Sequence, residues 1–193
     1  MNSQHAGSPL INEGGPRVFL FETMSQPVLI ETLAADDVAP ASWLGDALLA
    51  LNNAHAQELS WLEPARLQYL VGQAFLARRI GNLDAVVLAM DQDARYDSPN
   101  FQWFRARYPR FVYVDRIVVA PKARGLGYAR RLYRDLFDHA LRAGHERVVC
   151  EVNSRPPNPE SDAFHAALGF VGVGSANIHS DSKTVRYLAR KLD

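Results

Sequence analysis

Residues 114–129 read VDRIVVAPKARGLGYA, and the rest of the chain is organised around this run. Its first half is rich in β-branched residues over a strand-like length and stops at Pro121, which predicts a β-strand. After the run, apolar residues recur at helical spacing at Leu132, Leu136 and Ala140, which predicts an amphipathic helix. A strand, a short loop with two glycines and a helix therefore follow one another.

The loop between this strand and this helix has the chemistry of an anion site. Gly125 and Gly127 carry no Cβ, so backbone N–H groups can approach a ligand closely. The free N–H groups at a helix N-terminus attract phosphate, and Arg124 adds a suitable charge. The alternative is a plain strand-to-helix turn with a solvated arginine. The loop lacks the Gly-Lys-Ser/Thr ending of an NTPase loop and the full Gly-x-Gly-x-x-Gly of a dinucleotide-binding unit.

The loop resembles the cofactor loop of a known superfamily. Arg124, Gly127 and Ala129 match the Arg/Gln-x-x-Gly-x-Gly/Ala signature of the GNAT superfamily of acetyl-CoA-dependent N-acetyltransferases, and Val119 and Pro121 sit where that superfamily commonly carries Val-x-Pro. A second signature, similar to the family's Asn-x-x-Ala…Tyr…Gly-Phe segment, follows in the right order at Asn158, Ser161, Phe164 and Leu168-Gly169-Phe170. The resemblance covers roughly residues 110–192.

The resemblance implies an α/β fold of the GNAT type, a mixed central β-sheet flanked by helices in which two parallel strands splay apart to admit the pantetheine arm. It implies acetyl-CoA as cosubstrate, no metal, and direct attack by an amine in a ternary complex. Backbone N–H groups near Val118 and Val119 would stabilise the oxyanion. The residues expected to bind the cofactor are Ile117, Val118, Val119, Arg124, Gly125, Leu126, Gly127, Tyr128, Ala129, Asn158, Ser161 and Phe164.

The expected acid and base each have an alternative. His165 occupies the position that usually holds the family's tyrosine acid, and a pKa near 6.5 suits proton transfer at neutral pH. It could instead be an exposed helix residue, with Tyr96, Tyr113 or Tyr128 as substitute donors. Asp115 stands where polyamine acetyltransferases of the superfamily carry a glutamate, which makes it the candidate base. The alternatives are an Asp115–Arg116 edge or a structural ion pair with Arg147.

Composition limits the remaining function classes. The 193 residues fit one domain, predicted at 24–193, after a flexible extension at 1–23 that is rich in Ser, Gly, Asn and Pro. Lysine plus arginine equals aspartate plus glutamate at 21 each, so no global field recruits nucleic acid or an acidic membrane. The single cysteine, Cys150, is expected in the core and excludes an internal disulfide. With no transmembrane or signal pattern in the sequence, we expect a cytoplasmic protein, and we keep a homodimer open.

The other elements follow from apolar patterns and turn residues. Strands are predicted at 28–33, 74–80, 83–90, 111–119, 147–152, 169–173 and 184–192, and helices at 36–53, 64–71, from the glycine loop to 143, and 162–168. Strands interleaved with helices give a mixed α/β sheet.

Residues 91–110 show no clear periodicity and are predicted to be a long loop that covers the acceptor pocket. The alternative is that Trp103 and Phe104 cap the core. The residues expected to bind the acceptor are Asp91, Tyr96, Asp97 and Trp103, with His55 and Glu58 as further candidates because the corresponding helix-loop-helix often lines the pocket in relatives. Trp61 is expected in the core.

Acidic residues near the predicted pocket favour a small cationic amine as acceptor. A protein N-terminus or a lysine is an alternative. A second function class is a non-catalytic acyl-CoA-binding regulatory module, which the missing tyrosine at His165 supports.

Overall fold

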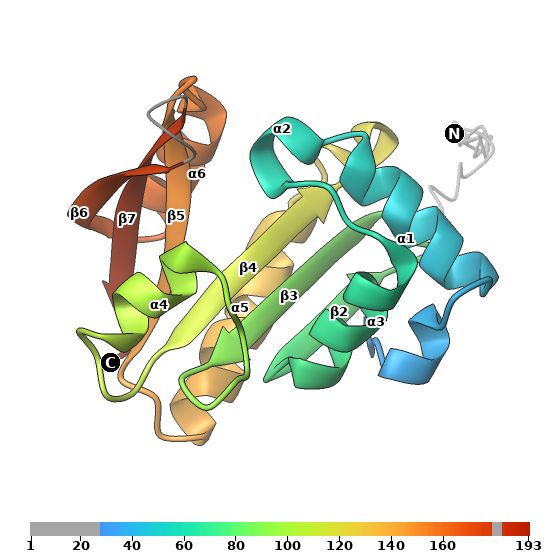
Figure 1. The fold of residues 1–193 in the computed structure, drawn as a ribbon, viewed down its shortest axis with the longest axis horizontal. Helices are drawn as coiled ribbons and strands as arrows, with labels where there is room; N and C mark the ends of the chain where they lie inside the picture. The colour runs from blue at the N-terminus through green and yellow to red at the C-terminus, as the bar shows by residue number, and fades with distance from the viewer. Residues whose placement is uncertain (1–27, 179–182) are drawn as a thin grey trace, which may run out of the picture.

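The structure, a computed structural model, describes residues 28–178 and 183–193. These residues build one seven-stranded mixed sheet with the strand order β1-β2-β3-β4-β5-β7-β6. Helices cover both of its faces (Figure 1). The extension predicted at 1–23 lies outside the described residues.

The N-terminal half of the sheet is an antiparallel meander. Its strands are β1 (Ile30–Thr32), β2 (Leu76–Ile80), β3 (Ala85–Asp91) and β4 (Val112–Val119). The sequence of β3, AVVLAMD, is buried at every position but the last, as expected for a strand that is covered on both faces. The predicted hairpin at 74–90 is confirmed, with its turn at Gly81, which adopts a φ of 54°.

Two groups of helices sandwich these strands. On one face lie η1 (Ala35–Val38), α1 (Trp43–Asn53), α2 (Ala56–Leu59) and α3 (Pro64–Gln73), and on the other lies α5 (Tyr128–Arg142), as Figure 1 shows. Helix α5 buries the stripe Leu132, Tyr133, Leu136, Phe137 and Ala140 against the sheet. The helix predicted at 36–53 is interrupted, because the chain forms η1 first and α1 starts afresh at a cap in which Ser42 Oγ accepts a hydrogen bond from the Gly45 N–H.

The C-terminal half adds β5 (Arg147–Arg155), α6 (Pro159–Ala167), β6 (Val171–Ile178) and β7 (Lys183–Lys191). Strand β7 lies between β5 and β6 and is antiparallel to both. The sheet is joined in the middle by β4 and β5, which are parallel. The predicted mixed fold is therefore confirmed.

The two central strands separate soon after they meet. They pair only at Val112↔Val148 and Tyr113↔Val149. Directly after this, β4 contains a bulge, since Ala89 pairs with Val114 and Leu88 pairs with Arg116, which leaves Asp115 as the extra residue. Figure 1 shows β4 and β5 diverging beyond this point. The backbone of β4 that faces β5 is thus free of strand pairing from Val114 onward.

Other sequence predictions are also wrong in detail. The region 91–110 contains a helix, α4 (Pro99–Arg105), whose N-terminus is capped by Ser98 and whose Phe101 and Phe104 are fully buried. Trp61 is 63% exposed instead of lying in the core, with its Nε1 hydrogen-bonded to Glu63. Strand β5 continues three residues past the predicted end at 152. None of the helices in the described ranges combines the length and apolar character needed to cross a membrane.

Candidate active site

A cavity of about 560 Å³ occupies the gap between β4 and β5. Its walls come from β4 beyond the pairing, from β5 at Cys150–Asn153, from the glycine loop with the start of α5, from α6, and from α2. The bulge and the early end of the β4–β5 pairing create this space, because neighbouring strands in a continuous sheet lie too close to leave one. One continuous cavity therefore connects the glycine loop to the side chains at the point where the strands separate.

The glycine loop forms one end of the cavity. Gly125 and Gly127 have φ values of 78° and 75°, a left-handed conformation that favours glycine, and a Cβ placed on either would meet no atom within 4 Å. Gly127 is the N-cap of α5, a helix of 15 residues, so the first N–H groups of that helix are open to a ligand. Arg124 lines the same end. The predicted anion site therefore presents the N–H groups of a helix N-terminus and a guanidinium at one end of the cavity.

Most of the residues predicted to bind the cofactor line this cavity. Ile117, Val118 and Val119 supply its β4 wall, and Asn158, Ser161 and Phe164 supply its α6 wall. The exception is Leu126, which is 56% exposed and is not part of the wall.

His165 is buried in the wall of the cavity with both ring nitrogens engaged. Its Nδ1 lies 2.7 Å from the carbonyl oxygen of Ser161, and its Nε2 lies 2.8 Å from the hydroxyl of Tyr133. A carbonyl can only accept, so Nδ1 carries the ring proton and Nε2 accepts a hydrogen bond from Tyr133. Burial lowers the pKa of His165 and raises that of Tyr133, which keeps both side chains neutral. His165 is 4% exposed, which excludes the exposed-helix alternative.

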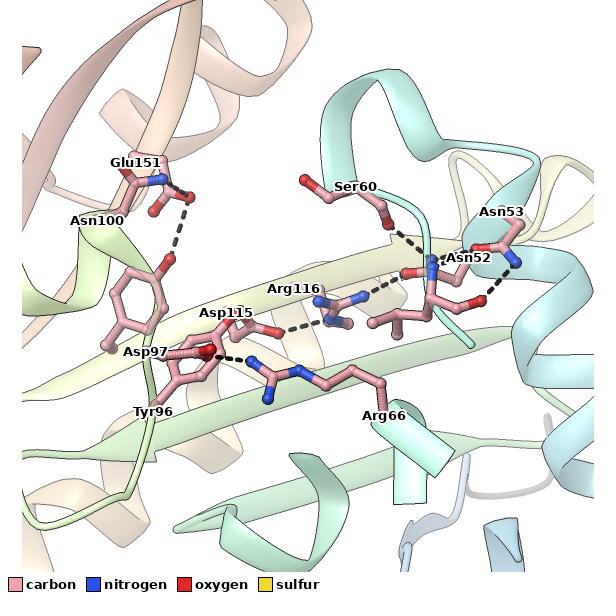
Figure 2. A network of polar contacts seen from close by, with 12 residues as sticks. Asn52, Asn53, Ser60, Arg66, Tyr96, Asp97, Asn100, Asp115, Arg116 and Glu151 are labelled. Carbon is pink, nitrogen blue, oxygen red and sulfur yellow. Dashed lines mark hydrogen bonds and ion pairs between the residues drawn. The ribbon is translucent and has the colours of Figure 1, made fainter. Parts of the chain in front are cut away.

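Asp115 is the centre of a buried polar network (Figure 2). Its Oδ2 accepts a hydrogen bond of 2.6 Å from Nε of Arg116, and its Oδ1 accepts one from the hydroxyl of Tyr96. The guanidinium of Arg116 continues to Oδ1 of Asn52 at 2.6 Å, and Asn52 donates to the carbonyl of Ser60. Of the alternatives for Asp115, the pair with Arg116 is present, while Arg147 pairs with its neighbour Glu146. The carboxylate of Asp115 is thus neutralised on one oxygen and hydrogen-bonded on the other.

A second carboxylate, Glu151 on β5, also lines the cavity. Its Oε1 accepts hydrogen bonds from the side-chain amide of Asn100 at 2.8 Å and from the hydroxyl of Tyr113 at 3.1 Å. Its Oε2 is buried and has no hydrogen-bond partner among the described residues. Burial, helped by the nearby charge of Asp115, raises the pKa of Glu151 to about 7, although the hydrogen bonds from Tyr113 and Asn100 oppose the rise. This carboxyl group can exchange a proton near neutral pH.

The family assignment rests on a match over most of the chain. The model of the acetyltransferase (GNAT) family matches residues 52–170, which include the glycine loop, both carboxylates and α6. The chain belongs to the GNAT acetyltransferase family. Comparison with curated protein sequences finds no significant match.

Solved structures share the GNAT fold at low sequence identity. The ribosomal-protein-S18-alanine N-acetyltransferase of Escherichia coli is 15% identical, with a TM-score of 0.61 over 86% of this chain and 94% of the other. Naa20 of Chaetomium thermophilum, solved in complex with a bisubstrate analogue, is 20% identical, with a TM-score of 0.63 over 86% and 87%. YncA of Salmonella typhimurium, solved with its cofactor acetyl-CoA, is 18% identical, with a TM-score of 0.59 over 86% and 94%.

The residues predicted to bind the acceptor in this GNAT protein are not brought together. None of Asp91, Tyr96, Asp97 and Trp103 is part of the cavity wall. Asp97 pairs with Arg66 at the surface, and Tyr96 reaches the site only through its bond to Asp115. Trp103 stacks on Tyr187 with ring centroids 4.1 Å apart. The acceptor-binding role of these four residues remains a prediction, and they do not line a common pocket.

Other residues of the site were missed or undervalued by the sequence analysis. His55 and Glu58 of the α1–α2 segment, named there only as further candidates, do line the cavity. Glu151 and Tyr133 were not predicted at all. The only local signal for Glu151 is a lone carboxylate inside the apolar run Val148–Val152. Cys150 is buried, as expected, and burial raises the pKa of its thiol.

Proposed function

We propose that this GNAT protein is an N-acetyltransferase that moves an acetyl group from acetyl-CoA to a primary amine by direct attack in a ternary complex, with a small cationic amine as the favoured acceptor. The supporting observation is the single cavity that joins an anion-binding helix N-terminus to a carboxyl group with a pKa near neutrality. Holding both substrates in one cavity supplies the large rate advantage of proximity.

The chain's own residues fit acetyl-CoA as the donor substrate. The N–H groups at the start of α5, with Arg124, suit the diphosphate, and Asn158 and Ser161 offer polar groups farther along the cavity. Asn158 also caps α6, because its Oδ1 accepts a hydrogen bond from the N–H of Ser161. The unpaired edge of β4 near Val118 and Val119 offers backbone N–H donors for the oxyanion that develops on the thioester carbonyl. Acetyl-CoA supplies an activated acyl group whose C–S bond breaks in the reaction.

Glu151 is a better candidate for the base than Asp115. A base must take a proton from the ammonium form of the acceptor, which requires a free lone pair and a suitable pKa. Each oxygen of Asp115 already accepts a hydrogen bond and its charge is paired with Arg116, whereas Oε2 of Glu151 has no partner among the described residues. The neutral amine nitrogen then attacks the thioester carbon, the C–S bond breaks, and the nitrogen loses one further proton as the leaving sulfur gains one.

The departing thiolate needs a proton, and the His165–Tyr133 pair is the proposed source. With a neutral ring, the only N–H proton of His165 points at the carbonyl oxygen of Ser161, so the transferable proton of the pair is that of the Tyr133 hydroxyl, which must turn from Nε2 of His165 to the thiolate to donate it. His165 then acts by holding that hydroxyl in place. In this proposal His165 takes part in catalysis by positioning Tyr133, and Tyr133 donates the proton to the thiolate.

A cationic acceptor is favoured by two carboxylates of the cavity wall, one from α2 and one from β5. Glu58 and Glu151 line the cavity, while the charge of Asp115 is balanced by Arg116. These two carboxylates would attract an ammonium group and disfavour an anionic one.

Release of CoA from acetyl-CoA, followed with a panel of acceptors, tests the proposal. The panel contains an alkyl diamine, an amino alcohol, a peptide with a free N-terminus, and an N-terminally blocked peptide with one lysine. We expect amine-dependent release with the diamine, lowered about 10²-fold or more in Glu151→Gln. Asp46→Asn on the surface of α1 is the matched control and keeps full turnover. Release of CoA with a peptide but with neither small amine would indicate a protein acceptor. Tight binding of acetyl-CoA without release of CoA in the presence of any amine would favour the non-catalytic module.

A further inference from the structure

We propose that Asn100 is the positioning residue of Glu151, and that helix α4 serves to hold its amide against that carboxylate. The proposal rests on the proposed function, in which Glu151 is the base. It assigns a role to the region 91–110, which the sequence predicted to be a loop over the acceptor pocket.

The amide of Asn100 is tied at both ends. Its Nδ2 donates to Oε1 of Glu151 at 2.8 Å, and its Oδ1 accepts from the hydroxyl of Tyr187 at 3.0 Å. Glu151 and Tyr187 are direct cross-strand partners in the β5–β7 ladder, so their side chains share one face of the sheet. Because a carboxylate only accepts, the amide nitrogen must face Glu151, and the hydroxyl then completes the arrangement. Figure 2 shows Asn100 reaching from α4 to Glu151.

Helix α4 is itself fixed against β6 and β7. Trp103 stacks on Tyr187 at 4.1 Å, and the guanidinium of Arg107 covers Trp103, 3.8 Å from the ring centroid. On β6, Gly174 makes room for the indole, since a Cβ there would lie 2.6 Å from Trp103. Trp103 is therefore a support of the site that acts through α4.

This support directs the carboxylate of Glu151. Asn100 and Tyr113 both bind Oε1, so the group is held by one oxygen while Oε2 keeps its lone pairs. A base held in a fixed direction loses less entropy when it takes a proton from a bound substrate.

The pKa of Glu151 is set by its burial and by the polar groups around it, and the amide of Asn100 is one of these groups. The titratable groups near Glu151 are Tyr113 and Asp115 on β4, Cys150 on β5, Tyr187 on β7, Tyr133 on α5, and Tyr96, which precedes α4; the charge of Asp115 is paired with Arg116. The Asn100 amide favours the charged form of Glu151. Its removal should raise the pKa of Glu151 above 7 and push the acidic limb of catalysis to higher pH.

The test compares wild type with Asn100→Leu in two readouts. The pKa of Glu151 is followed by NMR of ¹³C-labelled glutamate carboxyls, with Glu151→Gln identifying the signal. The pH profile of kcat/KM is measured separately. Since a hydrogen bond to a charged group contributes about one pKa unit or more, we expect the carboxyl pKa and the acidic limb to rise together by about one unit. The dissociation constant of acetyl-CoA should not change.

Gln102→Leu is the matched control, because it removes another amide of α4, whose hydrogen bond goes to the backbone of Tyr96. It should leave the pKa of Glu151 unchanged. An unchanged pKa in Asn100→Leu, or an equal shift in Gln102→Leu, would overturn the proposal. If the carboxyl pKa of Glu151 rises while the acidic limb of kcat/KM stays at the same pH, the contact with Asn100 is confirmed but Glu151 is not the base. If Asn100→Leu does not fold, Tyr187→Phe, which retains the stack on Trp103, should give a smaller shift in the same direction, and no shift there would also overturn it.

Discussion

Replacing Glu151 by glutamine should change how stability depends on pH. The carboxyl has a pKa of about 7 in the folded protein against an ordinary value of 4.5. The folded state therefore binds a proton between these values that the unfolded state has released, so wild-type stability falls as pH rises from 4.5 to 7 and is level above that. From pH 5 to pH 8 this amounts to about 2–3 kcal/mol at about 1.4 kcal/mol per pKa unit. Glutamine has a similar shape but does not titrate.

The assay is urea unfolding of wild type and Glu151→Gln at pH 5, 6, 7 and 8. The free energy of unfolding of the variant minus that of wild type should increase by about 2–3 kcal/mol across this range, because all other titrations are shared by the two proteins. A difference that stays flat would mean that the pKa of Glu151 is ordinary. A difference that falls with pH would mean that Tyr113 and Asn100 outweigh burial and hold the carboxylate charged.

Three further predictions concern other parts of the site. His165→Phe should lower kcat about 10²-fold or more and leave acetyl-CoA affinity unchanged in steady-state kinetics and calorimetry; unaltered turnover would remove His165 from the mechanism. Arg116→Leu should destabilise the protein by about 3–5 kcal/mol in denaturant melts because it leaves Asp115 buried and unpaired, and the double change with Asp115→Leu should recover much of the loss. Without that recovery, the cost would not come from the unpaired charge. Trp103→Ala should lower the free energy of unfolding by about 3 kcal/mol without weakening acetyl-CoA binding in the same melts. Loss of acetyl-CoA binding without loss of stability would mean that Trp103 contacts a bound substrate.

The fold was largely predictable because its signals are local. The β-branched run of β4, the glycines before α5 and the turn at Gly81 specify their elements within a few residues. Helix α4 was missed because its aromatic and polar residues have no clear helical period, although Ser98-Pro99 is an N-cap followed by a proline suited to the first turn.

The polar contacts of the site were less predictable because they join distant parts of the chain. Glu151 depends on Asn100 and Tyr113, which are 51 and 38 residues away. Asp115 and Arg116 are neighbours, and in a regular strand their side chains would point to opposite faces. They meet beside the bulge at Asp115, a feature that the apolar pattern does not reveal.

Thermal unfolding with and without acetyl-CoA shows whether the cavity binds this cosubstrate, with Gly127→Glu as the paired variant. Glutamate at this position brings a negative charge and a side chain to the predicted diphosphate site, where a Cβ itself would meet no other atom within 4 Å. At about 100 times its dissociation constant, acetyl-CoA should stabilise wild type by about 2.7 kcal/mol, a rise in Tm of roughly 5–10 °C. We expect this rise in wild type and none in Gly127→Glu. No rise in wild type at millimolar acetyl-CoA, or an equal rise in the variant, would contradict this expectation.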